Sequence, residues 1–179
     1  FRRVLFRSIP YGAIISTIGA SEAASAHGEL IESYEFQFLV VAKQKASLLA
    51  GREIPAHVYV DAQRARRHVI RAFETLFESC DVIVSVARAD GAPRHDAPLD
   101  TLTSASAPEG AVQPNNRAIV PASNLAGLPA VVVPCGFTTS GLPVALQFVG
   151  PAWSEPTLVA LGEWFQSQTE WHSLRPAQH

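Results

Sequence analysis

The stretch that decides the fold is SNLAGLPAVVVPCGF, residues 123–137, in which turn-forming residues lead into a run of valines. Gly127 and Pro129 favour a turn, and the run 131–133 has the continuous apolar character of a strand covered on both faces. Gly136 lets the chain turn again where that strand ends. We therefore expect these residues to form scaffold, with no chemistry of their own.

The neighbouring segments predict an α/β layer. VALQFVG, residues 144–150, is a second strand, and Ser140 with Gly141 supplies a turn, so it should pair with 130–134 as an antiparallel hairpin. DVIVSV, residues 81–86, is predicted to be a short buried strand directly after a helix. Helices are expected over residues 14–33, 36–51, 55–79 and 154–171. A helix that runs into a strand places the chain in the α/β class.

Four features of these helices follow from the sequence. In the second helix, Gly51 is a plausible C-terminal stop. Ser154 is the expected N-cap of the last helix. The apolar positions of the second helix recur at helical spacing and are Phe38, Leu39, Ala42, Ala46 and Leu49. The basic run 64–68 on the third helix is interpreted as a solvated face, so no ligand is assigned to it.

Residues 87–116 are rich in Pro, Ala, Ser and Asp and show no sustained period. This composition predicts a long surface loop. Loops of such length inside compact domains are usually lids, site walls or disordered segments, so this one is the expected flexible element near a ligand.

Composition narrows the class of protein. The chain has 179 residues, of which 47% are hydrophobic and 17% charged, which suits one globular domain. A formal charge of −2 gives no reason to expect a nucleic-acid partner. The longest apolar runs fall far below the roughly 18 residues of a membrane helix, so no membrane association is expected. Two cysteines without framework spacing favour a reducing cytoplasm.

The start of the chain is atypical because the sequence contains no methionine. FRRVLFRS, residues 1–8, matches the in-frame translation of a common sequencing-library adapter, so we interpret it as a technical scar. Without Arg2, Arg3 and Arg7 the formal charge falls from −2 to −5. The authentic domain is then expected to span residues 9–179.

No catalytic residue emerges from the motifs. The histidines lack the close spacing of a zinc helix, no G-x-S-x-G elbow occurs, and no metal or other cofactor is implied. His95 and Asp96 form only a weak base and carboxylate pair. Cys135 follows a strand but has no histidine near it in sequence, so a structural role is preferred over a nucleophile. The only lysines, Lys43 and Lys45, lie on the polar side of a helix.

The order of segments resembles the C-terminal part of the amidase signature family. The resemblance rests on IGASEAASAHGELI, DVIV, NRAIVPASNLAGLPAVVVPCGF, GLPVALQFVG, SEPTLVALGEWFQ and EWHSLRP, and spans residues 12–176. Residues 116–150 are its most specific part. It implies a mixed β-sheet core covered by helices and a serine nucleophile activated by a second serine and a lysine, acting on small-molecule carboxamides to release ammonia.

In that family the catalytic residues lie in an upstream Gly/Ser-rich region, and this chain contains no such run. We therefore expect an amidase fragment that is inactive alone, from an enzyme whose homodimeric state is left open. One alternative is a fragment of the A-type subunit of a glutamine-dependent aminoacyl-tRNA transamidase. Another, of a different class, is a complete non-catalytic binding module.

Substrate contacts are expected just before the valine strand. Arg117, Ser123 and Asn124 are the candidates, because loops at strand ends line ligand sites in α/β folds. Arg117 stands about where the transamidase subunits typically have an acid, and the residues directly after the strand 81–86 lack the proline and threonine usual there. Both departures argue against the transamidase alternative, but they do not exclude it.

Overall fold

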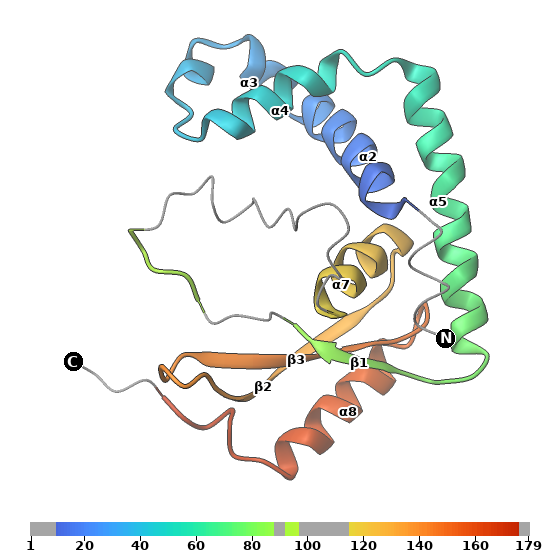
Figure 1. Cartoon of the computed structure of the whole chain (residues 1–179), viewed down its shortest axis with the longest axis vertical. Coiled ribbons are helices and arrows are strands. Elements are labelled where there is room, and N and C mark those ends of the chain that lie inside the picture. The colour runs from blue at the N-terminus through green and yellow to red at the C-terminus, as the bar shows by residue number, and fades with distance from the viewer. Residues whose placement is uncertain (1–9, 88–91, 97–114, 176–179) are drawn as a thin grey trace. The chain divides into compact units, whose positions relative to one another are not determined.

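The fold is described from a computed structural model that covers residues 10–87, 92–96 and 115–175, apart from the side chains of 115–118. The chain divides into two compact units (Figure 1). The first comprises residues 1–69 with 94–110, and the second residues 70–93 with 111–179.

The first unit is helical. Its elements are α2 (Tyr11–Ala26), α3 (Gly28–Glu32), the 3-10 helix η1 (Tyr34–Phe38), α4 (Ala42–Arg52) and the start of α5 (Ala56–Phe77). Ala24, Ile31 and Leu48 form its buried core. α2 and α4 pack together, and Gly51 of α4 lies so close to Ala20 of α2 that a β-carbon there would meet the Ala20 carbonyl.

The two predicted N-terminal helices are each broken in the structure. The first ends at Ala26 with His27 as its C-cap, and a separate short helix, α3, begins at Gly28. The second divides into η1 and α4, so 36–51 is not one helix. Its expected apolar face was wrong, since Phe38 and Leu49 are exposed whereas Leu48 and Gly51 are buried. Gly51 lies inside α4, where its missing side chain allows the close approach to α2.

The long helix α5 confirms the third predicted helix to within a few residues. Ala62, Val69 and Phe73 are buried along it. None of the helices in the described residues combines the length and apolarity needed to cross a membrane.

The second unit contains a three-stranded sheet made of β1 (Ile83–Val86), β2 (Ala130–Phe137) and β3 (Pro143–Val149) in the order β1-β3-β2. Both strand pairs are antiparallel, which confirms the predicted hairpin of β2 and β3. Its turn is closed by the Gly141 amide, which donates to the Thr138 carbonyl at 3.0 Å. The α/β class predicted from the sequence is confirmed.

Helices α7 (Asn115–Ala126) and α8 (Glu155–Ser167) lie on opposite sides of this sheet (Figure 1). On the α8 side, Val133 and Phe148 pack with Leu158 of α8. Ser154 precedes α8 as expected, but its hydroxyl donates to the Pro151 carbonyl at 2.7 Å and does not cap the helix.

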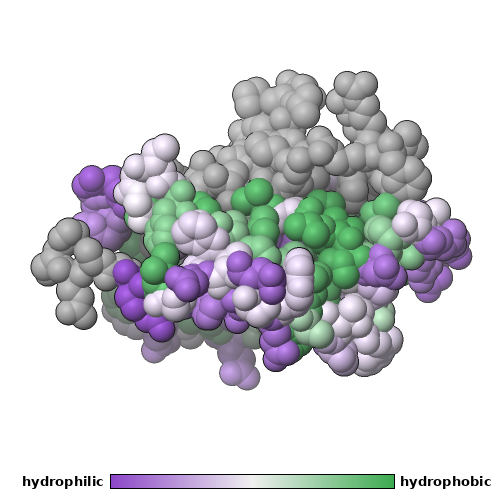
Figure 2. Space-filling model, turned by 90° about the horizontal axis from the view of Figure 1, so that it is seen from below, coloured by the Kyte–Doolittle hydropathy of each residue, from purple (hydrophilic) through white to green (hydrophobic). Residues whose placement is uncertain are grey.

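Apolar residues gather in a continuous band on the side seen from below (Figure 2). The outer strands of the sheet also carry exposed valines. Val84 of β1 pairs with Phe148 and is 56% exposed, and Val132 of β2 pairs with Gln147 and is 54% exposed. The expectation that the valine strand and β1 are fully buried is therefore wrong for the described residues, because neither α7 nor α8 covers these positions.

Helix α7 was not predicted. Residues 115 and 116 belong to it, although the sequence places them in the loop 87–116, most of which lies outside the described residues. Pro121 sits inside α7 and removes one backbone donor. Asn115, Ser123 and Asn124 are also weak helix formers, and α7 packs against β1, a contact that supports the helix.

Candidate functional site

The three predicted substrate residues all belong to α7, whose last turn is fixed by a Schellman motif. The Leu128 amide donates to the Ser123 carbonyl at 3.0 Å, and the Gly127 amide donates to the Asn124 carbonyl at 3.1 Å. Gly127 has a φ of 75°, a left-handed conformation that glycine adopts without strain. The sequence GLP therefore ends α7 sharply and directs the chain into β2.

The environments of these candidates differ. The Ser123 side chain is buried, and its hydroxyl donates to the Val120 carbonyl at 3.1 Å. Asn124 is exposed next to it. Arg117 lies in the first half of α7, and its side chain is outside the described residues. Asn124 is thus the one of the two described side chains that is accessible to a ligand.

Cys135 occupies a β-bulge. Pro134 pairs with Ala145 and Gly136 pairs with Val144, which leaves Cys135 as the extra residue of β2. Gly136 has a φ of 149° at this irregularity. Burial raises the pKa of the Cys135 thiol, which favours the protonated, non-nucleophilic form. This environment suits a structural cysteine.

The His95 and Asp96 pair does not form a base with its orienting carboxylate. Arg94 donates to both carboxylate oxygens of Asp96, at 2.9 Å from Nε and 2.8 Å from Nη2. The Arg94 guanidinium lowers the pKa of the Asp96 carboxyl. The carboxylate is engaged by its arginine neighbour in this exposed segment.

The two lysines lie on α4. Lys45 Nζ donates to the Gln37 carbonyl at 3.0 Å and sits 5.6 Å from the centroid of the Phe36 ring. A lysine base for amide hydrolysis has to be desolvated next to a serine hydroxyl, and Lys45 is engaged elsewhere. Among the described residues, no group of three His, Cys, Asp or Glu side chains gathers as a metal site.

The sequence analysis did not identify two buried polar residues, Gln147 and Ser85, on the α7 side of the sheet. Gln147 of β3 is only 6% exposed, and its neighbours across the strands are Ser85 of β1 and Val132 of β2. The buried hydroxyl of Ser85 has no hydrogen-bond partner among the described residues. A glutamine within the apolar strand 143–149 was the only signal in the sequence.

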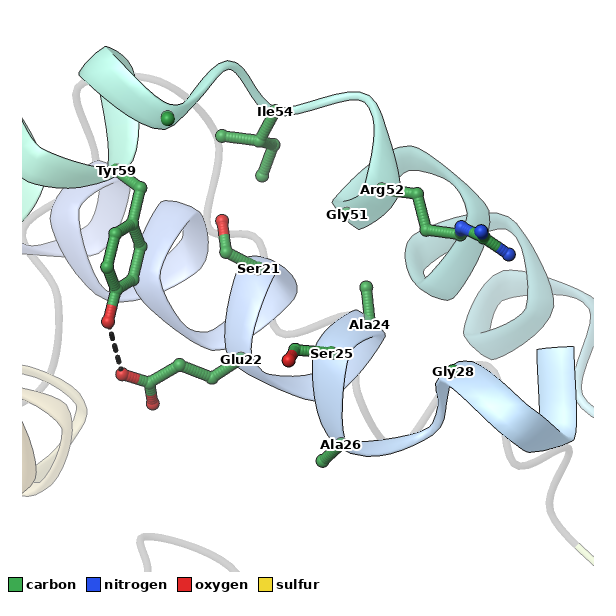
Figure 3. Close-up of a pocket in the computed structure, with 11 residues that line it drawn as sticks. Ser21, Glu22, Ala24, Ser25, Ala26, Gly28, Gly51, Arg52, Ile54 and Tyr59 are labelled. Carbon is green, nitrogen blue, oxygen red and sulfur yellow. Dashed lines mark hydrogen bonds between the residues drawn. The ribbon is translucent and has the colours of Figure 1, made fainter.

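Sequence reasoning also missed a cavity of about 730 Å³ within the first unit (Figure 3). Residues of α2, α4 and α5 line it, among them Ser21, Glu22, Arg52 and Tyr59. Tyr59 reaches from α5 to Glu22 and donates to Oε1 at 3.0 Å. The run of small residues 23–26 leaves this space open, but their composition alone does not predict a cavity.

Comparisons with known proteins agree on the family. The Amidase family model matches residues 35–159, which is more than half of the chain. The A-type subunit of the glutamyl-tRNA(Gln) amidotransferase of Psychrobacter sp. is 37% identical over 115 residues, which are 64% of this chain and 21% of that protein. Its counterpart from Thiobacillus denitrificans is 33% identical over 144 residues, 75% of this chain and 27% of that protein.

Solved structures show the same fold. An amidase superposes with a TM-score of 0.69 at 20% identity, over 89% of this chain and 35% of its own. A bacterial aryl acylamidase superposes with a TM-score of 0.70 at 16% identity, over 93% of this chain and 36% of the acylamidase chain. The chain spans about a quarter of the length of the curated relatives it matches. On the match to the family model, this chain belongs to the Amidase family.

Proposed function

We propose that the chain is the C-terminal part of an amidase that hydrolyses small-molecule carboxamides to carboxylate and ammonia, and that it is inactive by itself. The observation that carries the proposal is the combination of family membership with the placement of the lysines. Both lysines of the sequence lie on α4, where Lys45 binds the Gln37 carbonyl. The nucleophile, its base and the oxyanion donors have to act together, so the chain alone lacks acyl-transfer chemistry.

The second unit then serves as scaffold for the substrate site. The Schellman turn after α7 presents Asn124 at the surface, next to the start of β2. Asn124 is proposed to contact the substrate, with Arg117 as a second candidate on the same helix. Ser123 is proposed to act mainly by holding the turn, because its hydroxyl already bonds the Val120 carbonyl.

A second candidate function is the amide-donor half-reaction of a transamidase. It is favoured by the curated relatives, which are A-type subunits of glutamyl-tRNA(Gln) amidotransferases. In that case glutamine is the substrate and the ammonia passes to a partner subunit. Free Cys80 and Cys135 fit a reducing cytoplasm for either enzyme. A homodimer and the absence of a nucleic-acid partner stay predictions.

The test replaces the matching segment of an active amidase with residues 9–179. We expect ammonia release from aliphatic and aromatic amides by this chimaera and none by the 179-residue chain alone. The same chimaera with the host nucleophile changed from serine to alanine is the control. Release of ammonia by the lone chain that disappears on Cys135→Ala or His95→Ala would contradict the proposal. Preference of the chimaera for glutamine would favour the transamidase branch.

A further inference from the structure

Two polar side chains, Ser85 and Gln147, lie next to each other on the face of the sheet opposite α8. They are direct partners across β1 and β3. Side chains alternate between the two faces of a strand, and Phe148 packs on the α8 side, so Gln147 and its partner Ser85 belong to the α7 side. The β-carbons of such partners are roughly 5 Å apart. One small molecule can therefore contact both side chains.

Neither side chain uses its hydrogen-bonding capacity. The Ser85 hydroxyl oxygen is closed to solvent and has no hydrogen-bond partner among the described residues. Gln147 is 6% exposed, and the described part of the chain gives its side-chain amide no partner either. The amide offers two N–H donors and a carbonyl acceptor, and the hydroxyl offers one donor and one acceptor oxygen. Nearly all buried polar groups in proteins are paired, so these two call for a bound molecule.

The two groups select a small neutral molecule that both donates and accepts hydrogen bonds. Neither residue is charged, and an ion brought into a neutral site loses its hydration without gaining a counter-charge. The molecule has to be small, because the Ser85 hydroxyl is closed to solvent. Val132, the other neighbour of Gln147 across the sheet, is 54% exposed, so solvent reaches this row from the β2 side. Water meets these conditions and is the usual partner of such buried groups.

We propose that one internal water molecule binds between Ser85 and Gln147 and bridges β1 to β3. The water accepts the hydrogen of the Ser85 hydroxyl and donates to Gln147 Oε1. This bridge adds a side-chain link to a short ladder, since β1 contributes 4 residues to it. It also accounts for the glutamine among the apolar residues of β3. The inference concerns the second unit and does not depend on the hydrolytic activity proposed above.

The test detects long-lived water by NMR magnetisation transfer from water to the isotope-labelled 179-residue chain. Carbon-bound protons are observed, because hydroxyl and amide protons exchange with the solvent. We expect the signal of a slowly exchanging internal water at the β-protons of Ser85 and the γ-protons of Gln147. Gln168, an exposed glutamine at the end of α8, is the matched control and should show only short-lived surface water.

Two variants of β1 locate the water. Ser85→Val keeps a side chain suited to a strand but removes the hydroxyl and fills the space beside it, so the internal-water signal at Gln147 should disappear. Val84→Thr changes the neighbouring residue, which belongs to the opposite face of β1 and is 56% exposed. This control should leave the signal at Gln147 unchanged. Circular dichroism checks that each variant is folded.

Ser85→Ala distinguishes a bound water from an empty space through stability. Loss of a hydroxyl that binds water removes a hydrogen bond and should lower the urea concentration at the midpoint of unfolding, whereas loss of an unpaired buried hydroxyl would raise it. The proposal is overturned if Ser85 and Gln147 of the wild-type chain show only short-lived surface water. It is also overturned if the signal at Gln147 persists in folded Ser85→Val, or if Ser85→Ala unfolds at a higher urea concentration than the wild type.

Discussion

Gly162 of α8 lies so close to Val131 of β2 that a β-carbon at position 162 would stand 3.2 Å from Val131 Cγ1 and 3.5 Å from Val133 Cγ1. The glycine therefore sets how closely α8 approaches the sheet. Any larger residue has to push the helix away from the core residues Phe148 and Leu158.

Gly162→Ala should lower the free energy of unfolding by about 1 kcal/mol, because overpacking outweighs the better helix propensity of alanine. Gly19→Ala on α2 is the matched control, since nothing lies within 4 Å of a β-carbon there. That change should raise stability by up to about 1 kcal/mol. Urea denaturation at fixed protein concentration measures both, and equal shifts in the same direction would refute the close packing of α8.

Gly51→Ala should cost more, about 2 kcal/mol, because its β-carbon would meet backbone atoms of Ala20, which cannot rotate away. Gly28→Ala, which has open space around it, is the control in the same unit. Hydrogen exchange of the α2 and α4 amides measures the change locally. Undiminished protection of α2 in Gly51→Ala would mean that the two helices do not cross as described.

Val132→Thr should reduce concentration-dependent association of the chain. Val132 is 54% exposed on an outer strand whose edge is open within the described sheet, and such edges pair with other chains. Threonine keeps the β-branched shape and reduces the apolar surface. Val159→Thr, at 50% exposure on α8, is the control that should have little effect. Light scattering across a dilution series checks this, and a wild-type chain that is monomeric throughout would contradict it.

The stability of the chain should fall in alkali partly through Cys135. Because burial raises the pKa of this thiol in the folded state, its contribution is fully present below the pKa of the unfolded thiol. It is lost as the pH rises from roughly 8.5, the usual thiol value, through the raised folded-state pKa. Cys135→Ala should therefore flatten the alkaline limb of a plot of unfolding free energy against pH. An unchanged alkaline limb in Cys135→Ala would contradict this prediction, because it would mean that the thiol ionises as easily in the folded chain as in the unfolded chain.

The elements that could be predicted are those whose pattern is local. The apolar stripe of α5 and the turn at Ser140 and Gly141 are determined by residues close together in the sequence, so their positions could be predicted. α7 was not predicted, because Pro121 and its polar neighbours disfavour a helix, and the contact of α7 with β1 leaves no mark in the local sequence. The role of Gly51 was not predicted either, because glycine is used both at the C-terminus of a helix and at a close crossing of two helices. The sequence alone does not distinguish the two roles.

The candidate site was predictable only in part. The motif around Asn124 indicated where a ligand-facing turn lies, but burial of the neighbouring Ser123 depends on how α7 packs. The bond between Tyr59 and Glu22 joins side chains that are distant in sequence. Such pairs leave no periodic trace, so the cavity became visible only in three dimensions.

The strand order β1-β3-β2 has a consequence for the speed of folding. β2 and β3 are joined by a short turn and close a small loop, whereas β1 reaches β3 only after the chain between Val86 and Leu146 has been drawn together. Closing that larger loop costs more conformational entropy. The hairpin should therefore form first and β1 should add late, so the arrival of β1 sets the folding rate of the second unit.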